Sequence, residues 1–224
     1  MGLDTKELNV FFFGDSICFG QGVSVHHGWV THIAEKLNEF SRQYNTEVIV
    51  INSAVNGCTT RQALERMPYD IQSWKVDIIT VQFGMNDCNY WKTDRGVPRV
   101  SPAGFAANLE EIISRARAFN INNIFLSTNH PSTHDQQIMP YTDITYQDSN
   151  RQYNEIIREV AKVTHVNLIE IEKYWLEQLE KGLRLRDLLL PDTVHLSVLG
   201  HNLYFEIVYP HIEKAVKRLL HIES

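Results

Sequence analysis

The chain has 224 residues, of which 43% are hydrophobic and 21% are charged, and its formal net charge at pH 7 is -6. This length suits one large α/β domain. We expect a single domain over residues 1–224, because no linker, internal repeat or low-complexity tract interrupts the sequence. The negative charge, without any run rich in lysine or arginine, argues against nucleic acid or an anionic membrane as the main partner.

The sequence favours a cytoplasmic protein. The first strand-like run starts near residue 8, which leaves no room for a signal peptide. No apolar run approaches the ~20 residues that a membrane-spanning helix needs, so we expect no stable membrane insertion. Cys18, Cys58 and Cys88 are odd in number and widely spaced, which favours free thiols in a reducing compartment. The sequence does not indicate an oligomeric state.

Short strand-like runs alternate with helical patterns along the whole chain. The strand-like runs span residues 8–13, 47–51, 77–83, 123–127 and 166–169. Helical spacing of apolar residues lies at 29–40, 64–67, 102–116, 153–161 and 174–179, and a last helix starts at 197. Pro68 should end or bend its helix, and Pro210 should bend or restart the last one. The alternation predicts a three-layer α/β/α fold with a five-stranded parallel sheet in the order 2-1-3-4-5.

The first strand-like run ends abruptly at Gly14-Asp15-Ser16. Gly14 breaks the apolar run, and Asp15 or Ser16 can cap a helix that follows. A hydroxyl at the carboxyl end of a central parallel strand stands where open α/β sheets bind their ligands. A serine helix cap would explain this tripeptide by itself, so the case for chemistry depends on other residues.

Those residues follow the other predicted strands and precede the last helix. Asp192 and His195 stand three positions apart, which suits a local turn that brings the carboxylate to the imidazole. A serine hydroxyl attacks a carbonyl when a base takes its proton, and the base needs an acceptor on its other nitrogen. We therefore predict Ser16 as the nucleophile, His195 as the base and Asp192 as its orienting partner.

An acyl-transfer site also needs donors for the oxyanion of the tetrahedral intermediate. The backbone N–H groups of Ser16 and Gly57 and the side-chain amide of Asn86 form a plausible set. Glycine at position 57 would let the backbone come close to the oxyanion. We expect Asp87, which follows Asn86, to hold a loop through backbone bonds.

Four blocks of this sequence resemble, in the same order, those of the SGNH hydrolases, which are also called GDSL-type lipases and esterases. The blocks are Gly14-Asp15-Ser16-Ile17, Gly57 within Asn-Gly-Cys-Thr-Thr, Gly84-Met85-Asn86-Asp87, and Asp192-Thr193-Val194-His195-Leu196. The resemblance implies a flavodoxin-like sheet, the triad and oxyanion-hole roles given above, and neither a metal nor another cofactor. Asn56 departs from the family, which more often has a small residue before the glycine.

The resemblance covers thioesterases, lysophospholipases, short-chain esterases and carbohydrate O-deacetylases, so the substrate remains a small-molecule ester of open class. Met85, Tyr90 and Trp91, helped by Met139 and Tyr141, could line an apolar groove for a lipid-like acyl chain. The same loops could instead form a shallow polar site for an O-acetyl sugar. The long connection 128–147 has no period and is expected to be functional.

Several other residues allow a second interpretation. We expect His130 at the rim of the site and, because Pro131 breaks the helix that a His130–His134 pair would need, no metal there. The three cysteines are expected to pack the floor of the site, with redox sensitivity as the alternative. Arg95 and Arg99 could contact an anionic or sugar substrate or lie in solvent. The rival function is a non-catalytic module that binds an anion at Ser16, which leaves Asp192 and His195 without a role.

Overall fold

The computed structural model of the chain describes residues 6–134 and 136–222. Its centre is a parallel sheet in the order β2-β1-β3-β4-β5. The strands are β1 (Glu7–Gly14), β2 (Glu47–Asn52), β3 (Ile78–Gln82), β4 (Asn123–Ser127) and β5 (Asn167–Ile169). The predicted strand order and direction are therefore confirmed, and each strand agrees with its predicted range to within a single residue at either end.

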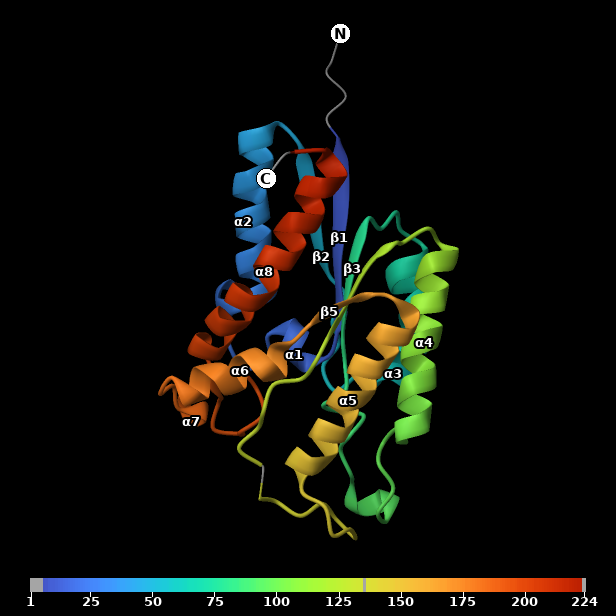
Figure 1. Cartoon of the computed structure of the whole chain (residues 1–224), viewed down its shortest axis with the longest axis vertical. Helices are drawn as coiled ribbons and strands as arrows, with labels where there is room; N and C mark the ends of the chain where they lie inside the picture. Colours follow the sequence, from blue (N-terminus) through green and yellow to red (C-terminus); the bar gives the residue numbers. More distant parts are fainter. Residues whose placement is uncertain (1–5, 135, 223–224) are drawn as a thin grey trace.

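Helices cover both faces of the sheet, as Figure 1 shows. On one face α2 (Trp29–Tyr44) packs against α8 (Val198–Leu220), and on the other α4 (Pro102–Ala118) packs against both α3 (Thr60–Met67) and α5 (Tyr146–Thr164). The shorter helices are α1 (Ser16–Phe19), α6 (Ile171–Glu180) and α7 (Leu185–Leu188). The three-layer α/β/α prediction is confirmed.

The central strands form because their side chains are apolar on both faces. In β1 every residue after Glu7 is buried, and all of β3 is buried, whereas the edge strand β2 is only partly covered. Phe12 meets Trp29 of α2 edge-on, and Phe13 meets Phe83 in the same way. Burying a side chain of this size stabilises the fold by roughly 1.5–3 kcal/mol. The packing of β1 therefore fixes the position of the residues that follow Gly14.

The two helix prolines behave differently. Helix α3 ends at Met67, as predicted, and Pro68–Gln72 forms one wide π-helical turn. Pro210 lies inside α8, which continues without a restart from Val198 to Leu220. Buried apolar residues lie on both sides of Pro210, and α8 packs against α2, α6 and β5. This packing offsets the hydrogen bond that proline cannot donate.

The connection from β4 to α5 lacks helices and strands over its described residues, apart from a bridge between Ile138 and Thr145. This agrees with the predicted loop, although α5 already begins at Tyr146. Over residues 6–134 and 136–222, no helix has the length and the apolar character to cross a membrane.

Candidate active site

Ser16 lies at the carboxyl end of β1, where it opens the short helix α1. Asp15 caps this helix, since its Oδ1 accepts from the backbone N–H of Ile17 at 3.0 Å. Gly20 ends the helix with φ 85°, a conformation that glycine adopts without steric cost. Trp29 of α2 also holds the turn, because its indole N–H donates to the Ile17 carbonyl at 2.9 Å. The strand and the capped turn thus fix Ser16 at the edge of the sheet that the carboxyl ends of the strands form.

The structure brings Ser16 and His195 together from opposite ends of the chain. Ser16 Oγ lies 2.8 Å from His195 Nε2, and His195 Nδ1 lies 2.8 Å from Asp192 Oδ2. A carboxylate can only accept hydrogen bonds, so Nδ1 carries the proton and Nε2 is left to accept from the Ser16 hydroxyl. This tautomer is the one in which the imidazole can take a proton from serine.

The turn that carries Asp192 and His195 is shaped by Asp192 itself. Its Oδ1 accepts from the backbone N–H groups of Val194 at 3.0 Å and His195 at 2.9 Å. Partial burial raises the pKa of Asp192, but these two bonds and the His195 contact outweigh it, and the net pKa lies below its usual value. Asp192 is therefore ionised at neutral pH and can stabilise a positive charge on His195.

A second segment holds this turn from below. His130 is fully buried, and its Nε2–H donates to the Val194 carbonyl at 2.9 Å while its Nδ1 accepts from the Tyr204 hydroxyl at 2.9 Å. Burial lowers the pKa of His130 to about 4, so the ring is neutral. Ser132 Oγ donates to the Thr193 carbonyl at 3.1 Å. The structure thus corrects the expected position of His130, which supports the turn from Asp192 to His195 instead of lying at the rim.

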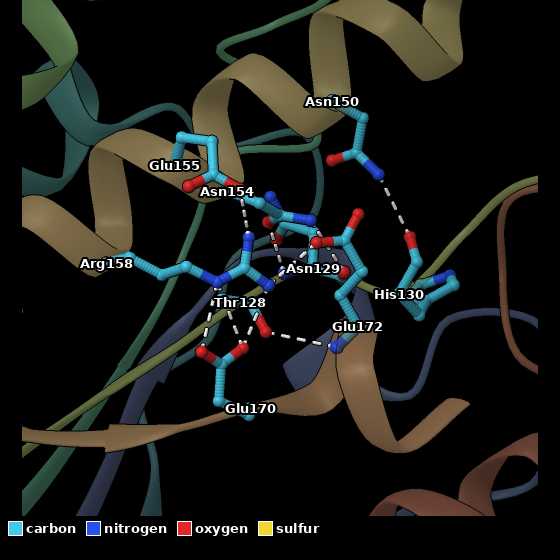
Figure 2. A network of polar contacts seen from close by, with 9 residues as sticks. All are labelled: Thr128, Asn129, His130, Asn150, Asn154, Glu155, Arg158, Glu170 and Glu172. Atoms are coloured by element: carbon cyan, nitrogen blue, oxygen red, sulfur yellow. Dashed lines mark hydrogen bonds and ion pairs between the residues drawn. The ribbon is translucent and has the colours of Figure 1, made fainter. Parts of the chain in front are cut away.

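The segment that carries His130 is itself anchored by buried polar bonds, which Figure 2 displays. Asn154 of α5 brackets Asn129, accepting its N–H at 2.7 Å and donating to its carbonyl at 3.1 Å. Asn150 donates to the His130 carbonyl at 3.0 Å, and Thr128 Oγ1 accepts from the N–H of Glu172 at 3.0 Å. Helices α5 and α6 therefore hold residues 128–130 in place, and these residues support the turn from Asp192 to His195.

The three expected oxyanion donors lie on neighbouring loops. Within residues 6–134 and 136–222, the backbone N–H groups of Ser16 and Gly57 make no hydrogen bond. Gly57 has φ 73°, a left-handed conformation in which a side chain is strained. Asn86 Nδ2 contacts Asp15 Oδ2 at 3.3 Å, which leaves a second N–H on the same amide. The arrangement can therefore present three N–H groups to one oxygen.

Two buried carboxyl groups lie beneath these donors. Burial raises the pKa of Asp15 to about 7, against the opposing bond from the Ile17 N–H. Burial also raises the pKa of Asp87 to about 6, although bonds from Thr60 oppose the shift. Asp87 Oδ1 accepts from the Thr60 N–H at 2.9 Å and from the Thr60 hydroxyl at 2.5 Å. The structural role predicted for Asp87 is confirmed.

A cavity of about 370 Å³ opens beside Ser16 and His195. Met85 and Tyr90 line it, as predicted, and so does Met139. Trp91 and Tyr141 are not among its lining residues; Trp91 is half exposed and Tyr141 largely exposed. Sequence reasoning missed part of the wall: Asn89, His134, Gln137, Pro140 and Tyr146. The Tyr146 hydroxyl donates to the Met85 carbonyl at 2.9 Å. This contact joins two segments that are distant in the sequence, so no local sequence pattern predicts it.

The three cysteines lie buried among the residues that the structure describes. Cys18, Cys58 and Cys88 are all buried free thiols, and burial raises the pKa of each. A raised thiol pKa disfavours the reactive thiolate, which supports the packing interpretation. In the part of the chain that the structure describes, no three His, Cys, Asp or Glu residues come close enough to hold a metal ion.

A sequence profile of the GDSL-like Lipase/Acylhydrolase family matches residues 12–203. The chain belongs to this family. Two curated relatives are esterases. The chain is 24% identical to an arylesterase of Vibrio mimicus over 133 residues, and 26% identical to esterase TesA of Pseudomonas aeruginosa over 118 residues. These matches cover 59% and 53% of both partners, so the chain aligns with little more than half the length of these curated relatives.

Solved structures of similar fold include an esterase and a lipase/acylhydrolase. The acetylxylan esterase Axe2 of Geobacillus stearothermophilus is 21% identical, with a TM-score of 0.74 and coverage of 93% of this chain and 95% of that one. A lipase/acylhydrolase of Enterococcus faecalis is 22% identical, with a TM-score of 0.70 and coverage of 92% and 96%. At this identity the likeness establishes the shared fold of this GDSL-family chain.

Proposed function

We propose that this chain is a serine ester hydrolase that uses Ser16, His195 and Asp192 as its catalytic triad. The observation that supports the proposal is a pair of consecutive hydrogen bonds, each of 2.8 Å, from the Ser16 hydroxyl to His195 and from His195 to Asp192. A module that only binds an anion would not require the hydrogen bonds from Ser16 to His195 and from His195 to Asp192. Membership of the GDSL-like family supports the same reaction class.

The geometry supports a two-step mechanism. In the first step Ser16 Oγ attacks the ester carbonyl while His195 Nε2 takes its proton, and Asp192 stabilises the resulting imidazolium. The carbonyl oxygen becomes an oxyanion and accepts from the N–H groups of Ser16, Gly57 and Asn86. The intermediate then collapses: the carbon–oxygen bond to the alcohol breaks, His195 returns the proton to the leaving oxygen, and an acyl-Ser16 ester remains.

The second step releases the acyl group. His195 takes a proton from a water molecule, whose oxygen attacks the acyl carbonyl and forms a second oxyanion at the same three donors. Collapse breaks the bond to Ser16 Oγ, which regains its proton from His195. The products are one alcohol and one carboxylic acid, and the chain is restored.

We further propose a short acyl ester of a polar alcohol, such as an O-acetyl sugar, as the substrate class. The cavity of about 370 Å³ is near the lower end of the range for small-molecule sites. Polar side chains from Asn89, His134 and Gln137 share its wall with Met85 and Met139. A long lipid chain would require a larger and more uniformly apolar groove. An acetylxylan esterase shares this fold, which supports the choice of an acetyl ester.

A fluorophosphonate probe tests the reaction class. The parent chain should react covalently at Ser16 and lose its esterase activity, and Ser16→Ala should neither hydrolyse esters nor take up the probe. Ser73→Ala, which removes an exposed hydroxyl elsewhere, should behave as the parent does. Undiminished hydrolysis by Ser16→Ala would refute the proposed nucleophile.

A panel of nitrophenyl esters of increasing acyl length, run beside acetylated sugars, tests the substrate class. We expect acetyl and butyryl esters to be hydrolysed faster than decanoyl esters, because the cavity limits the acyl chain. Acetylated sugars should be deacetylated as well. Faster turnover of the decanoyl ester would instead favour a lipid-like substrate.

A further inference from the structure

Arg99 connects the two loops that carry the expected oxyanion donors. Its Nη1 and Nη2 both donate to the Gly57 carbonyl at 3.2 Å, and Nη1 also donates to Asn86 Oδ1 at 3.2 Å. Gly57 follows β2 and Asn86 follows β3, so one guanidinium group ties two separate connections together. Arg99 contributes no atom to the wall of the cavity beside Ser16.

We propose that Arg99 is a positioning residue that assembles the oxyanion hole by holding Gly57 and Asn86 in place. This inference rests on the proposed function, because it assigns a role only if Gly57 and Asn86 stabilise an oxyanion. Arg99 acts through these two residues and does not touch the reacting atoms.

The first effect of Arg99 is to fix the orientation of the Asn86 amide. A carboxamide can lie either way round, with its oxygen or its nitrogen facing a given neighbour. Arginine can only donate, so Asn86 Oδ1 must face Arg99 and Nδ2 must face Asp15 and the site. The reversed amide would present an oxygen to the oxyanion. A cationic donor on Oδ1 also polarises the amide, which makes its N–H a stronger donor.

The second effect is to hold the Gly57 loop. No atom lies within 4 Å of the place where a Gly57 side chain would begin, and Val55 and Asn56 are exposed. Packing therefore contributes little to the position of this peptide. Backbone bonds from the Val55 N–H to the Gly14 carbonyl at 3.1 Å and from the Cys58 N–H to the Val55 carbonyl at 3.2 Å hold the two ends of the turn. The Arg99 bonds hold the Gly57 carbonyl itself.

Arg99 is itself kept in place by its own loop. Its guanidinium carbon lies 4.2 Å from the centre of the Trp91 ring, a cation–π contact. Its backbone N–H donates to the Asn89 carbonyl at 2.9 Å. The planar, forked guanidinium can serve two acceptors and stack on an indole at once, which a lysine ammonium cannot do. This contact also explains why the half-exposed Trp91 stands beside Arg99 rather than in the cavity.

Replacing Arg99 by alanine tests the proposal. Loss of one oxyanion donor typically lowers kcat by about 10²–10³; in Arg99→Ala both donors remain but are poorly placed, so we expect kcat to fall roughly 10- to 100-fold. KM should stay nearly unchanged, because the donors bind the transition state more strongly than the substrate. Arg99→Lys should also stay low, because it cannot supply the fork.

Chemical rescue separates positioning from a general loss of folding. An open recess next to Arg99 is lined by Arg61, Trp91 and Asp94, so guanidinium ions can reach the vacated place. At guanidinium concentrations far below the denaturing range, kcat of Arg99→Ala should rise in a saturable way. Arg61→Ala removes a positive charge from the same recess without contacting Gly57 or Asn86, and it should keep the parent kcat with no response to guanidinium. Thermal unfolding of each variant should show an intact fold.

The outcomes distinguish this inference from the proposed function. If the parent hydrolyses esters and Ser16→Ala does not, the function stands. Then a kcat of Arg99→Ala within twofold of the parent, or a fall that guanidinium does not reverse, overturns the positioning role alone. If the parent hydrolyses no ester at all, the proposed function fails first.

Discussion

At the scale of single residues, the turn from Asp192 to His195 contains a strained position. Thr193 lies between Asp192 and His195 with φ 69°, a left-handed conformation that is rare for a β-branched residue. Such a conformation costs on the order of 1–3 kcal/mol. The strain persists because the Thr193 carbonyl accepts from Ser132 Oγ and from the Thr133 N–H, and because Asp192 Oδ1 caps the turn from the other side.

Thr193→Gly should therefore raise the free energy of unfolding by about 1 kcal/mol. Glycine removes the strained Cβ and a hydroxyl that is buried without a hydrogen-bond partner among the described residues. These gains exceed the extra chain entropy that glycine brings to the unfolded state. Urea unfolding measures the change.

Thr133→Gly is the matched control, because Thr133 lies in the adjoining segment and its φ is not positive. This variant should lower the free energy of unfolding by roughly 0.5–1 kcal/mol. If Thr193→Gly destabilises the chain as much as Thr133→Gly does, then Thr193 is not strained.

At the scale of elements, the sequence predicted those features that depend only on residues close together in the chain. The five strands could be predicted because short apolar runs alternate with helical spacing along the chain. Asp192 could be paired with His195 because they share one turn. The opposite holds for the connection from 128 to 145. It has no period, so nothing in the sequence shows that Gln137 reaches the cavity or that His130 turns inward.

Histidine at position 130 shows why such positions escape prediction. Whether its ring faces solvent or the core depends on Val194 and Tyr204, which lie far along the chain. Arg99 is similar: the sequence marks an arginine in a loop, but only the fold brings Gly57 and Asn86 to it. Long-range pairings of polar groups outside the four family blocks therefore could not be predicted, whereas motifs contained within one loop could.

His130→Phe should lower both stability and turnover. Phenylalanine fills the space between the Trp175 and Tyr204 rings but leaves the Val194 carbonyl and the Tyr204 hydroxyl without their partner. Each unsatisfied buried group costs about 1–3 kcal/mol. The Asp192–His195 turn then loses a support, so kcat should fall about tenfold or more. Urea unfolding and ester hydrolysis measure the two effects.

The matched control is Tyr204→Phe, which removes the Nδ1 partner of His130 and leaves its bond to the Val194 carbonyl intact. It should lower stability by roughly 1 kcal/mol and reduce kcat much less than His130→Phe does. Equal losses of kcat in the two variants would show that general stability, rather than the Val194 bond, governs turnover.

At the scale of the whole molecule, buried ionisable groups with opposite shifts surround the site. Burial raises the pKa of Asp15 to about 7 and that of Asp87 to about 6. Burial lowers the pKa of His130 to about 4 and that of His201 to about 4. All four groups therefore favour the neutral state in the folded protein, and they oppose one another in the dependence of stability on pH.

The direction of each effect follows from proton binding. Between its ordinary pKa of 3.8 and its folded pKa of about 7, Asp15 binds more protons in the folded state than in the unfolded state. Its contribution to stability therefore falls as pH rises through this window. His130 binds fewer protons when folded between about 4 and its ordinary pKa of 6.5. Its contribution therefore rises with pH, and the two effects partly cancel in the acidic part of the range.

Asp15→Asn should remove the falling contribution and leave the rising one. The difference in free energy of unfolding, variant minus parent, should increase steadily as pH rises from about 4 to about 7 and then level off. Any constant loss from the altered contact with Asn86 shifts this curve vertically without changing its slope. Urea unfolding of both chains across this pH range measures the difference. A difference that is flat, or that falls with pH, would show that Asp15 is already ionised well below pH 7 in the folded protein.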